Sequence, residues 1–285
     1  MKKIFYTFLF FVLIVAGIYC AVYFYISSKA SALPINSPIL CKNHPNSKLP
    51  RMVAVGDSIT HGRVSFNYVN SLEEKFGTHY EFVNAGINSN LAFNVLNRIQ
   101  DIIDCNPEKI SILIGTNDVN STLDEARRNR YKKDMQLPQD PDKAWYEKNL
   151  RLIIATLKEK TKAEIAILSL PVIGEILTSE ENRKAKEYSD SIKTIASELG
   201  ITYLPLNEKM HSYLLEKKNL VNICSGDFNL YNGAFIKFFL LSESWDQVSQ
   251  ENGFYLVTDC LHLNAVGARM ISDLIGEFLE KGNRL

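Results

Sequence analysis

The chain has 285 residues, of which 46% are hydrophobic and 22% are charged. These values are ordinary for a globular protein with a sizeable core, and they exclude a largely disordered chain. The 32 Lys and Arg residues balance the 32 Asp and Glu residues, so the net charge does not favour binding to nucleic acid.

The N-terminal segment, residues 1–32, predicts a membrane anchor. Lys2 and Lys3 precede an apolar run over residues 4–26 that contains no charged residue. A spanning helix needs ~20 apolar residues and a secretory signal only ~7–15, so this run is long enough to cross a bilayer. The two lysines place the N-terminus in the cytoplasm and the rest of the chain outside it. Cleavage as a signal peptide near Ala32 is the alternative, because small residues precede that position.

Residues 33–50 are rich in Pro, Asn, Ser and Lys, and this composition predicts an extended linker between the membrane and the domain. A single domain, residues 51–285, is expected to follow, because no low-complexity segment interrupts it. Cys20 lies inside the apolar run, where bulky neighbours argue against a lipoprotein attachment site.

Short apolar runs that end at turn residues alternate with stretches of helical spacing along the domain. The expected strands are 52–55, 81–84, 110–114, 165–170 and 201–204, and the expected helices are 66–76, 91–104, 145–160, 179–199 and 265–279. This alternation predicts a three-layer α/β/α domain with a central parallel sheet of about five strands, whose active site lies at the carboxyl ends of the strands. A charged stretch, 120–142, and an aromatic-rich insertion at about 219–258 exceed this framework.

The cysteines outside the apolar run form an even set: Cys41, Cys105, Cys224 and Cys260. In an oxidising compartment such a set predicts at least one disulfide. The Cys224–Cys260 pair is favoured, since it would fasten the start of the aromatic-rich insertion to the turn at residue 260. Four reduced thiols are the alternative. The cysteines lack the close spacing of a zinc site, so no metal is expected.

A nucleophile and its base are suggested by two turns far apart in the sequence. Ser58 follows the first strand on a sharp turn, although a helix cap is the ordinary role of such a serine. A serine hydroxyl needs a general base, and the base needs a group that orients it. Asp259 and His262 have the spacing to supply both near the other end of the chain.

Two further turns suggest donors for an oxyanion. Gly86 can offer its backbone N–H with no side chain in the way, and Asn117 can offer its side-chain amide. The ordinary roles of these two residues are those of a turn glycine and an Asx-turn residue. His61, one turn from Ser58, is interpreted as structural, because so near a residue would point away from the open side of the hydroxyl.

Together these blocks resemble the SGNH hydrolases, also called GDSL esterases and lipases. Gly-Asp-Ser-Ile at 56–59 is similar to the first block of that family, Gly86 to the glycine of the second, and Gly-Thr-Asn-Asp at 115–118 to the third. Asp259 and His262 match the last block. The resemblance extends over roughly residues 52–275, and the four blocks together are far more specific than any one of them.

The resemblance implies a serine esterase that acts through a covalent acyl-enzyme, without a metal or an organic cofactor. Ser58, Asp259 and His262 would be the catalytic triad, and Ser58, Gly86 and Asn117 would form the oxyanion hole. The sequence departs from the family at Cys260, where many members have glycine, and in the second block, which lacks the further glycine that many members carry.

The substrate expected from the sequence is a small-molecule or lipid ester outside the cytoplasm, such as an acyl ester or a lysophospholipid. The alternatives are an acetyl group on envelope or host polysaccharide, acyl transfer in place of hydrolysis, and a non-catalytic, surface-anchored binding protein on the same fold.

The aromatic-rich insertion bears on this choice. Its large aromatic residues are Phe228, Tyr231, Phe235, Phe238, Phe239, Trp245, Phe254 and Tyr255. They could form an extra core helix over about 234–241, or they could wall an apolar pocket for an acyl chain. The second interpretation predicts that Phe238 and Phe239 favour acyl groups longer than acetyl.

Overall fold

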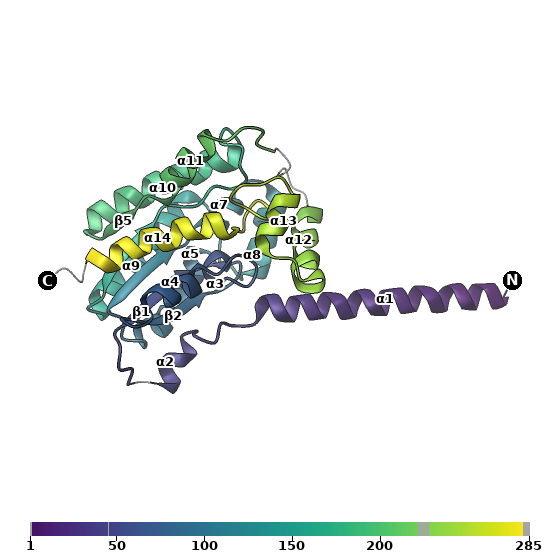
Figure 1. The fold of residues 1–285 in the computed structure, drawn as a ribbon, viewed down its shortest axis with the longest axis horizontal. Helices are drawn as coiled ribbons and strands as arrows, with labels where there is room; N and C mark the ends of the chain where they lie inside the picture. The colour runs from purple at the N-terminus through teal and green to yellow at the C-terminus, as the bar shows by residue number, and fades with distance from the viewer. Residues whose placement is uncertain (1, 45, 222–223, 225–227, 282–285) are drawn as a thin grey trace.

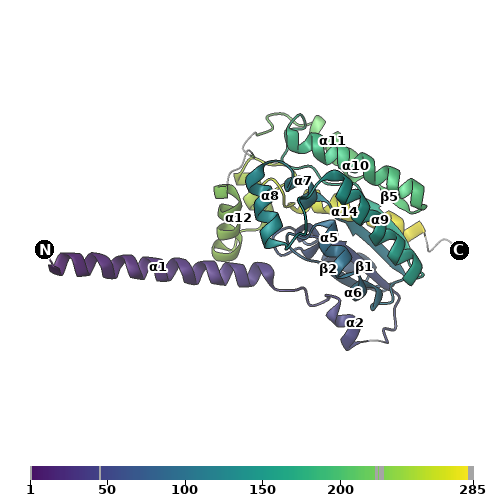
Figure 2. The same ribbon diagram turned by 180° about the vertical axis from the view of Figure 1, so that it is seen from behind.

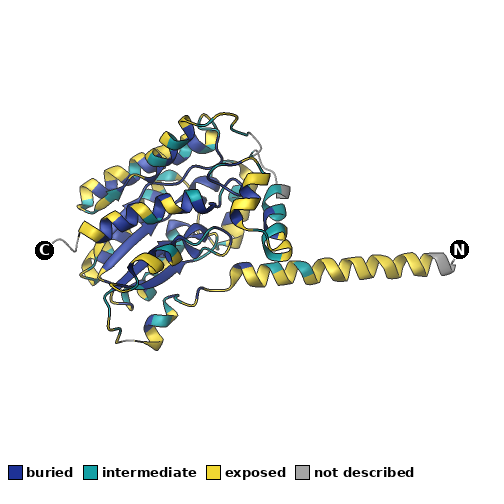
Figure 3. Cartoon of the chain, in the orientation of Figure 1, coloured by how far each residue is buried: buried dark blue, intermediate teal, exposed yellow. Residues whose placement is uncertain are grey.

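A computed structural model of the chain describes residues 2–44, 46–221, 224 and 228–281 (Figure 1). Its first helix, α1 (Lys2–Ser31), projects from an α/β domain. The stretch Phe5–Ser31 is long and apolar enough to cross a membrane, and its most apolar window makes no buried contact with the domain. Nearly all the described residues of α1 are exposed, whereas the strands of the sheet are mostly buried (Figure 3). An exposed apolar helix of this length is what a membrane span requires.

The central sheet has five parallel strands, as the sequence predicted. They are β1 (Arg51–Gly56), β2 (Glu81–Gly86), β3 (Lys109–Leu113), β4 (Glu164–Leu168) and β5 (Thr202–Leu204). Their order across the sheet is β2-β1-β3-β4-β5. Because Gly56 pairs with both Gly86 and Leu113, the ends of the first three strands lie side by side, and the turns after them share one edge.

Helices cover both faces of the sheet, because alternate residues of each strand point to opposite faces. One face packs against α4 (Tyr68–Phe76), α11 (Leu206–Leu215) and α14 (Ala265–Lys281), and the other against α5 (Ala92–Asn97), α6 (Ile99–Ile103), α9 (Lys143–Lys160) and α10 (Glu180–Leu199). Figures 1 and 2 show these two layers from opposite sides. The predicted three-layer α/β/α fold is therefore confirmed.

The helix expected over 91–104 is two helices, α5 and α6, divided at Arg98. The guanidinium of Arg98 turns back to the strand ends, where its Nε donates to Asn90 Oδ1 at 2.8 Å and an Nη donates to Gly56 O at 3.1 Å. Arg98 has a φ of −113°, outside the helical range, so these contacts are made at the point where the helix is interrupted.

The described part of segment 33–50 is folded, in contrast to the expected extended linker. It contains helix α2 (Ile39–Asn43), and Asn36 O accepts the Asn84 N–H of β2 at 2.7 Å. A disulfide joins buried Cys41 to Cys105. This segment is therefore attached to the domain at two points, one on β2 and one just before β3, which its polar composition did not reveal.

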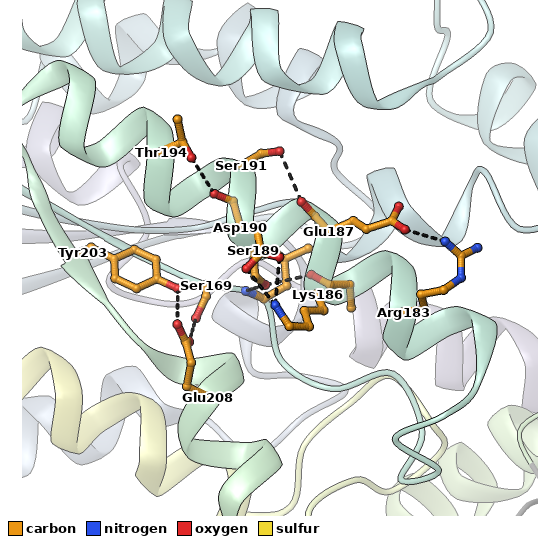
Figure 4. Close-up of polar contacts among 12 residues, drawn as sticks. Ser169, Arg183, Lys186, Glu187, Ser189, Asp190, Ser191, Thr194, Tyr203 and Glu208 are labelled. Atoms are coloured by element: carbon orange, nitrogen blue, oxygen red, sulfur yellow. Dashed lines mark hydrogen bonds and ion pairs between the residues drawn. The ribbon is translucent and has the colours of Figure 1, made fainter.

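Helix α10 is held to the sheet by polar contacts as well as by its apolar face (Figure 4). Ser189 Oγ accepts the Leu170 N–H just after β4 at 3.0 Å. Nearby, Glu208 of α11 accepts from Ser169 Oγ at 3.0 Å and from the Tyr203 hydroxyl at 2.8 Å. Helix α10 ends at Gly200, whose φ of 62° is left-handed, and this is the end expected from the sequence.

The two segments that exceed the sheet framework form helices at the carboxyl end of the sheet. The charged stretch contains α8 (Glu125–Asp134), and the aromatic-rich insertion contains α12 (Phe228–Leu241) and α13 (Trp245–Glu251). The short helices α3 (Ser58–His61) and α7 (Thr116–Asn120) follow β1 and β3 at the same edge.

Candidate active site

Three side chains from the two ends of the domain meet in a hydrogen-bonded line. Ser58 Oγ lies 2.9 Å from His262 Nε2, and His262 Nδ1 lies 2.7 Å from Asp259 Oδ2. Burial by itself would raise the pKa of the Asp259 carboxyl, but the adjacent His262 and two backbone N–H groups outweigh it and hold that pKa below its usual range. An ionised carboxylate therefore orients an imidazole toward a serine hydroxyl, as nucleophilic catalysis requires.

Ser58 owes its position to the turn after β1. It opens α3, and Asp57 caps that helix by accepting the Ile59 N–H at 3.0 Å. Gly56, directly before the turn, lies so close to Thr60 and Leu113 O that a Cβ there would clash with both. The sharp turn thus depends on glycine at position 56 and points the serine hydroxyl toward His262. Burial raises the pKa of Asp57 to about 6.

The turn that carries Asp259 and His262 is fixed by a disulfide. Cys260 has a left-handed φ of 80°, a conformation that favours glycine, and its sulfur is bonded to Cys224. Its carbonyl accepts the Gly174 N–H at 2.8 Å. The favoured disulfide is thus present in the structure. It holds Cys260, which stands where many SGNH hydrolases have glycine, in a backbone conformation typical of glycine.

Glu175 fixes the chain that leads to this turn. Its fully buried carboxylate accepts three consecutive backbone N–H groups, those of Tyr255 at 2.9 Å, Leu256 at 2.6 Å and Val257 at 3.2 Å. Burial raises the pKa of Glu175, and the three N–H groups oppose that effect. This role could not be predicted, because in the sequence an isolated acidic residue after β4 resembles any surface carboxylate.

Asn117 lies beside the serine with its amide held from both ends. Its Oδ1 accepts from the buried Tyr131 hydroxyl at 2.6 Å, and its Nδ2 donates to Asn90 O at 3.1 Å. An amide nitrogen carries two hydrogens, so the second is left for a ligand in the cavity. Tyr131 belongs to α8 in the charged stretch, and its contact with Asn117 could not be inferred from the sequence.

Gly86 is not brought to the cavity with the other residues. Its N–H donates to Asn84 Oδ1 at 3.0 Å, and a Cβ at this position would lie 2.2 Å from the backbone nitrogen of His61. Ser89, three residues later, lines the cavity and has a left-handed φ of 61°. Close backbone packing explains the glycine at 86, and the residues shortly after it, Asn88 and Ser89, line the cavity.

His61 lies next to this packing contact and away from the serine hydroxyl, whose partner is His262. Its side chain is buried, and burial, followed by the charge of Arg63, lowers its pKa. These features agree with the structural role expected for it.

The cavity beside Ser58 has a volume of about 350 Å³, and most of the residues that line it have polar or charged side chains, with apolar surface between them. Besides the serine, histidine and aspartate, the polar and charged side chains in its wall are Asn88, Ser89, Asn117, Asn120, Arg127, Arg130, Asp134 and Glu181. Val64, Met135, Ile173 and Leu261 add apolar surface. Charged residues of α8 form one side of this cavity. In the sequence they stood out only as a charged stretch that the expected strands and helices did not include.

The aromatic residues of the insertion form a small core of their own. Phe238 stacks on Trp245 with ring centroids 3.9 Å apart, and Phe239 packs against the same cluster. Neither lines the cavity, so the expected acyl-chain wall is absent at these two positions. Tyr231 alone of the insertion's described aromatic residues reaches the cavity, where its ring lies 5.7 Å from that of His262. The side chain of Phe228 lies outside the described residues.

Several solved structures share this fold. The acetyl xylan esterase AlAXEase is 19% identical with a TM-score of 0.56, over 80% of this chain and 98% of that chain. Axe2, an acetylxylan esterase from Geobacillus stearothermophilus, is 17% identical with a TM-score of 0.58, over 81% of this chain and 95% of that chain. An α/β hydrolase enzyme from the metagenome of Lake Arreo, Spain, is 19% identical with a TM-score of 0.55, over 79% and 93%.

A comparison with curated protein sequences gives no match. The GDSL-like lipase/acylhydrolase family, in contrast, matches residues 54–270, which include every strand except the start of β1 as well as the serine, aspartate and histidine. The resemblance stated from the four sequence blocks is thereby confirmed, and the chain belongs to the GDSL-like lipase/acylhydrolase family of serine ester hydrolases.

Proposed function

We propose that this protein is a membrane-anchored, extracytoplasmic O-acetylesterase that removes acetyl groups from carbohydrate. The observation that carries the proposal is the set of polar and charged side chains in the wall of the cavity beside Ser58. A long acyl chain gains free energy by burial against apolar surface, at ~25 cal/mol per Å². Amide, guanidinium and carboxylate groups offer it little of that gain, whereas they can hydrogen-bond the hydroxyls of a sugar.

Two further observations support this proposal over a lipid substrate. The aromatic residues expected to hold an acyl chain pack on Trp245 instead of lining the cavity. Several of the solved structures with this fold are described as esterases of acetylated xylan or xylo-oligosaccharides. An acetyl group itself needs only a small space next to the serine.

The reaction proposed here uses the three aligned side chains in two halves. Ser58 Oγ attacks the ester carbonyl as its proton passes to His262 Nε2, and Asp259 stabilises the imidazolium that results. The sugar hydroxyl leaves with that proton, and an acetyl ester remains on Ser58. Water, deprotonated by His262, then attacks this ester, releases acetate and restores the serine.

The oxyanion of each tetrahedral intermediate would be met by donors already held in place. We assign these donors to the Ser58 N–H, the free hydrogen of Asn117 Nδ2 and the backbone at Ser89. The N–H of Gly86 is not included, because Asn84 occupies it.

Helix α1 and the two disulfides support the proposed location. An uncleaved α1 would hold the domain on the outer surface of the membrane, where the Cys41–Cys105 and Cys224–Cys260 bonds are stable. We expect the protein to fractionate with membranes and to resist carbonate extraction. A soluble form that begins at Leu33 would show cleavage instead.

The substrate proposal is tested with p-nitrophenyl esters of increasing chain length and with acetylated xylo-oligosaccharides. We expect kcat/KM to be highest for acetate, to decline with chain length, and to be accompanied by release of free acetate from the oligosaccharides. Ser58→Ala is the matched control and should abolish turnover with the fold unchanged. A several-fold rise in kcat/KM for each added pair of carbons would contradict the proposal, because ~0.8 kcal/mol per buried methylene is the signature of an acyl pocket.

A further inference from the structure

Helix α12 is apolar on the side that faces away from the domain. Its inner side chains, Ala234 and Phe235, are buried against Val64 and Trp245. Its outer surface carries Ile236, Leu240 and Leu241, which are 43%, 40% and 63% exposed. Ile236 and Leu240 are four residues apart and therefore share one face of the helix. Nothing in the described part of the chain covers this face.

The same face continues to Gly233, one turn earlier. A Cβ built at Gly233 meets no atom within 4 Å, so this stretch of the surface is open as well. The basic residue of the helix, Lys237, reaches aside to form an ion pair with Glu251 of α13 at 2.5 Å. The outer face of α12 thus remains uncharged, as in a surface that contacts lipid.

The position of α12 relative to α1 indicates what covers this face. The two helices are in contact, since Ile26 packs against the cluster of buried residues that contains Ala30, Ala234 and Phe235. In both views of the ribbon, α12 is the outermost element of the domain on the side where α1 departs, and it runs across the direction of α1 (Figures 1 and 2). Its outer face therefore points along α1, toward the N-terminus.

The length of α1 locates the bilayer surface at this contact. A hydrocarbon core of ~30 Å takes ~20 helical residues, which counted from Phe5 end at Phe24. Tyr23 and Tyr25 are exposed at this level, where interfacial tyrosines are enriched. Ile26 and Ala30 then lie ~3 Å and ~9 Å beyond Phe24, within the headgroup layer of ~5–8 Å and at its outer edge. A helix packed on these two residues lies in the headgroup layer.

We propose that α12 is an interfacial helix that rests in the outer leaflet of the membrane crossed by α1, with Ile236, Leu240 and Leu241 in contact with lipid. Tyr231, on the opposite side of the helix, lines the cavity beside His262. The cavity wall is therefore about one helix diameter, ~10 Å, from lipid. The inference rests on α1 remaining attached, and it does not depend on which ester is hydrolysed.

The test measures contact with lipid in the full-length protein reconstituted into vesicles. Cys20, the free cysteine of the described residues, is first replaced by serine. A nitrobenzoxadiazole fluorophore is then attached at Ile236→Cys or, as the matched control, at Leu152→Cys. Leu152 is 44% exposed, close to the 43% of Ile236, but belongs to α9, which lies on the side of the domain away from α1 (Figure 2). Both labelled proteins should retain hydrolysis of p-nitrophenyl acetate, which verifies their folding.

The vesicles are made of phosphatidylcholine and phosphatidylglycerol, with or without headgroup spin-labelled phosphatidylcholine as a quencher. We expect several-fold quenching at position 236 and none at position 152. Equal quenching at the two positions would overturn the proposal. Energy transfer between differently labelled copies at position 236, without quenching by lipid, would assign this face to a second copy of the chain and would also overturn it.

A second variant separates lipid contact from catalysis. With the fluorophore at Leu241→Cys, the double substitution Ile236→Glu and Leu240→Glu should abolish quenching by the spin-labelled lipid and leave the hydrolysis of p-nitrophenyl acetate unchanged. Persistent quenching in this variant would show that these side chains do not hold the helix at the bilayer.

Discussion

The contact between Tyr131 and Asn117 allows the proposed oxyanion hole to be tested without removing a donor. In Tyr131→Phe, Asn117 Oδ1 loses a hydrogen bond of 2.6 Å and Asn120 Nδ2 loses one of 3.1 Å, and both groups are buried. Removing a whole oxyanion donor, as in Asn117→Ala, typically costs ~3 kcal/mol of transition-state stabilisation. Tyr131→Phe keeps the donor and one of its two anchors, the bond to Asn90 O. We therefore expect about half that cost, or a fall in kcat of roughly 10-fold.

The assay measures steady-state hydrolysis of p-nitrophenyl acetate by the wild type, the two single variants and the double variant, which together form a double-mutant cycle. Tyr131→Phe should lower kcat in the wild-type background and have almost no effect in the Asn117→Ala background, because the amide it orients is then absent. Tyr203→Phe is the matched control, since it also removes a hydroxyl that is hydrogen-bonded to a side chain, 2.8 Å from Glu208, but lies outside the cavity. An equal fall in kcat in both backgrounds would refute the positioning role of Tyr131.

Three more predictions concern the turns around the site. Loss of the Cys224–Cys260 bond, which joins residues 36 positions apart, should lower the free energy of unfolding by about 4 kcal/mol. The double variant Cys224→Ala with Cys260→Gly should keep more activity than Cys224→Ala with Cys260→Ala, since glycine accepts the φ of 80°. Equal losses of activity in the two double variants would contradict this. Burial raises the pKa of Asp118 to about 8, so the folded protein keeps this carboxyl protonated and should lose stability as the pH rises from ~4 through 8. Asp118→Asn should make Tm fall less steeply over this pH range, and an unchanged dependence of Tm on pH would count against the prediction. Gly86→Ala should lower the Tm measured by thermal melting, whereas Ser89→Gly should retain its kcat. A Gly86→Ala variant that is stable but inactive would indicate that Gly86 is an oxyanion donor after all.

The sequence predicted the sheet well because each strand is a short apolar run that ends at a turn residue, a signal carried by the strand itself. Helix α10 was equally clear, since Ser179 and Gly200 mark its two ends. The break between α5 and α6 could not be predicted, because it accompanies contacts of Arg98 with Asn90 and Gly56 O. The fold of segment 33–50 likewise depends on a disulfide to a distant residue.

The candidate site follows the same division between local and distant information. The residues that meet at Ser58 could be named from the sequence because their local blocks are specific in combination. Gly86 was expected at the oxyanion hole because a glycine offers an open N–H, yet Asn84 occupies that N–H and the backbone of His61 explains the glycine. The aromatic residues of α12 show that density in the sequence predicts burial but does not reveal which surface buries them.

The folded segment between α1 and the domain has a mechanical consequence. A flexible linker of 18 residues would have a root-mean-square end-to-end distance of ~25 Å, so the domain could move by about that distance from its anchor. Cys41 is instead bonded to Cys105, Asn36 is bonded to β2, and the end of α1 packs on α12. In the anchored protein that we propose, the domain would therefore stay close to one height above the bilayer. It would act on material at the membrane surface, and lateral diffusion of α1 would be its means of reaching new substrate.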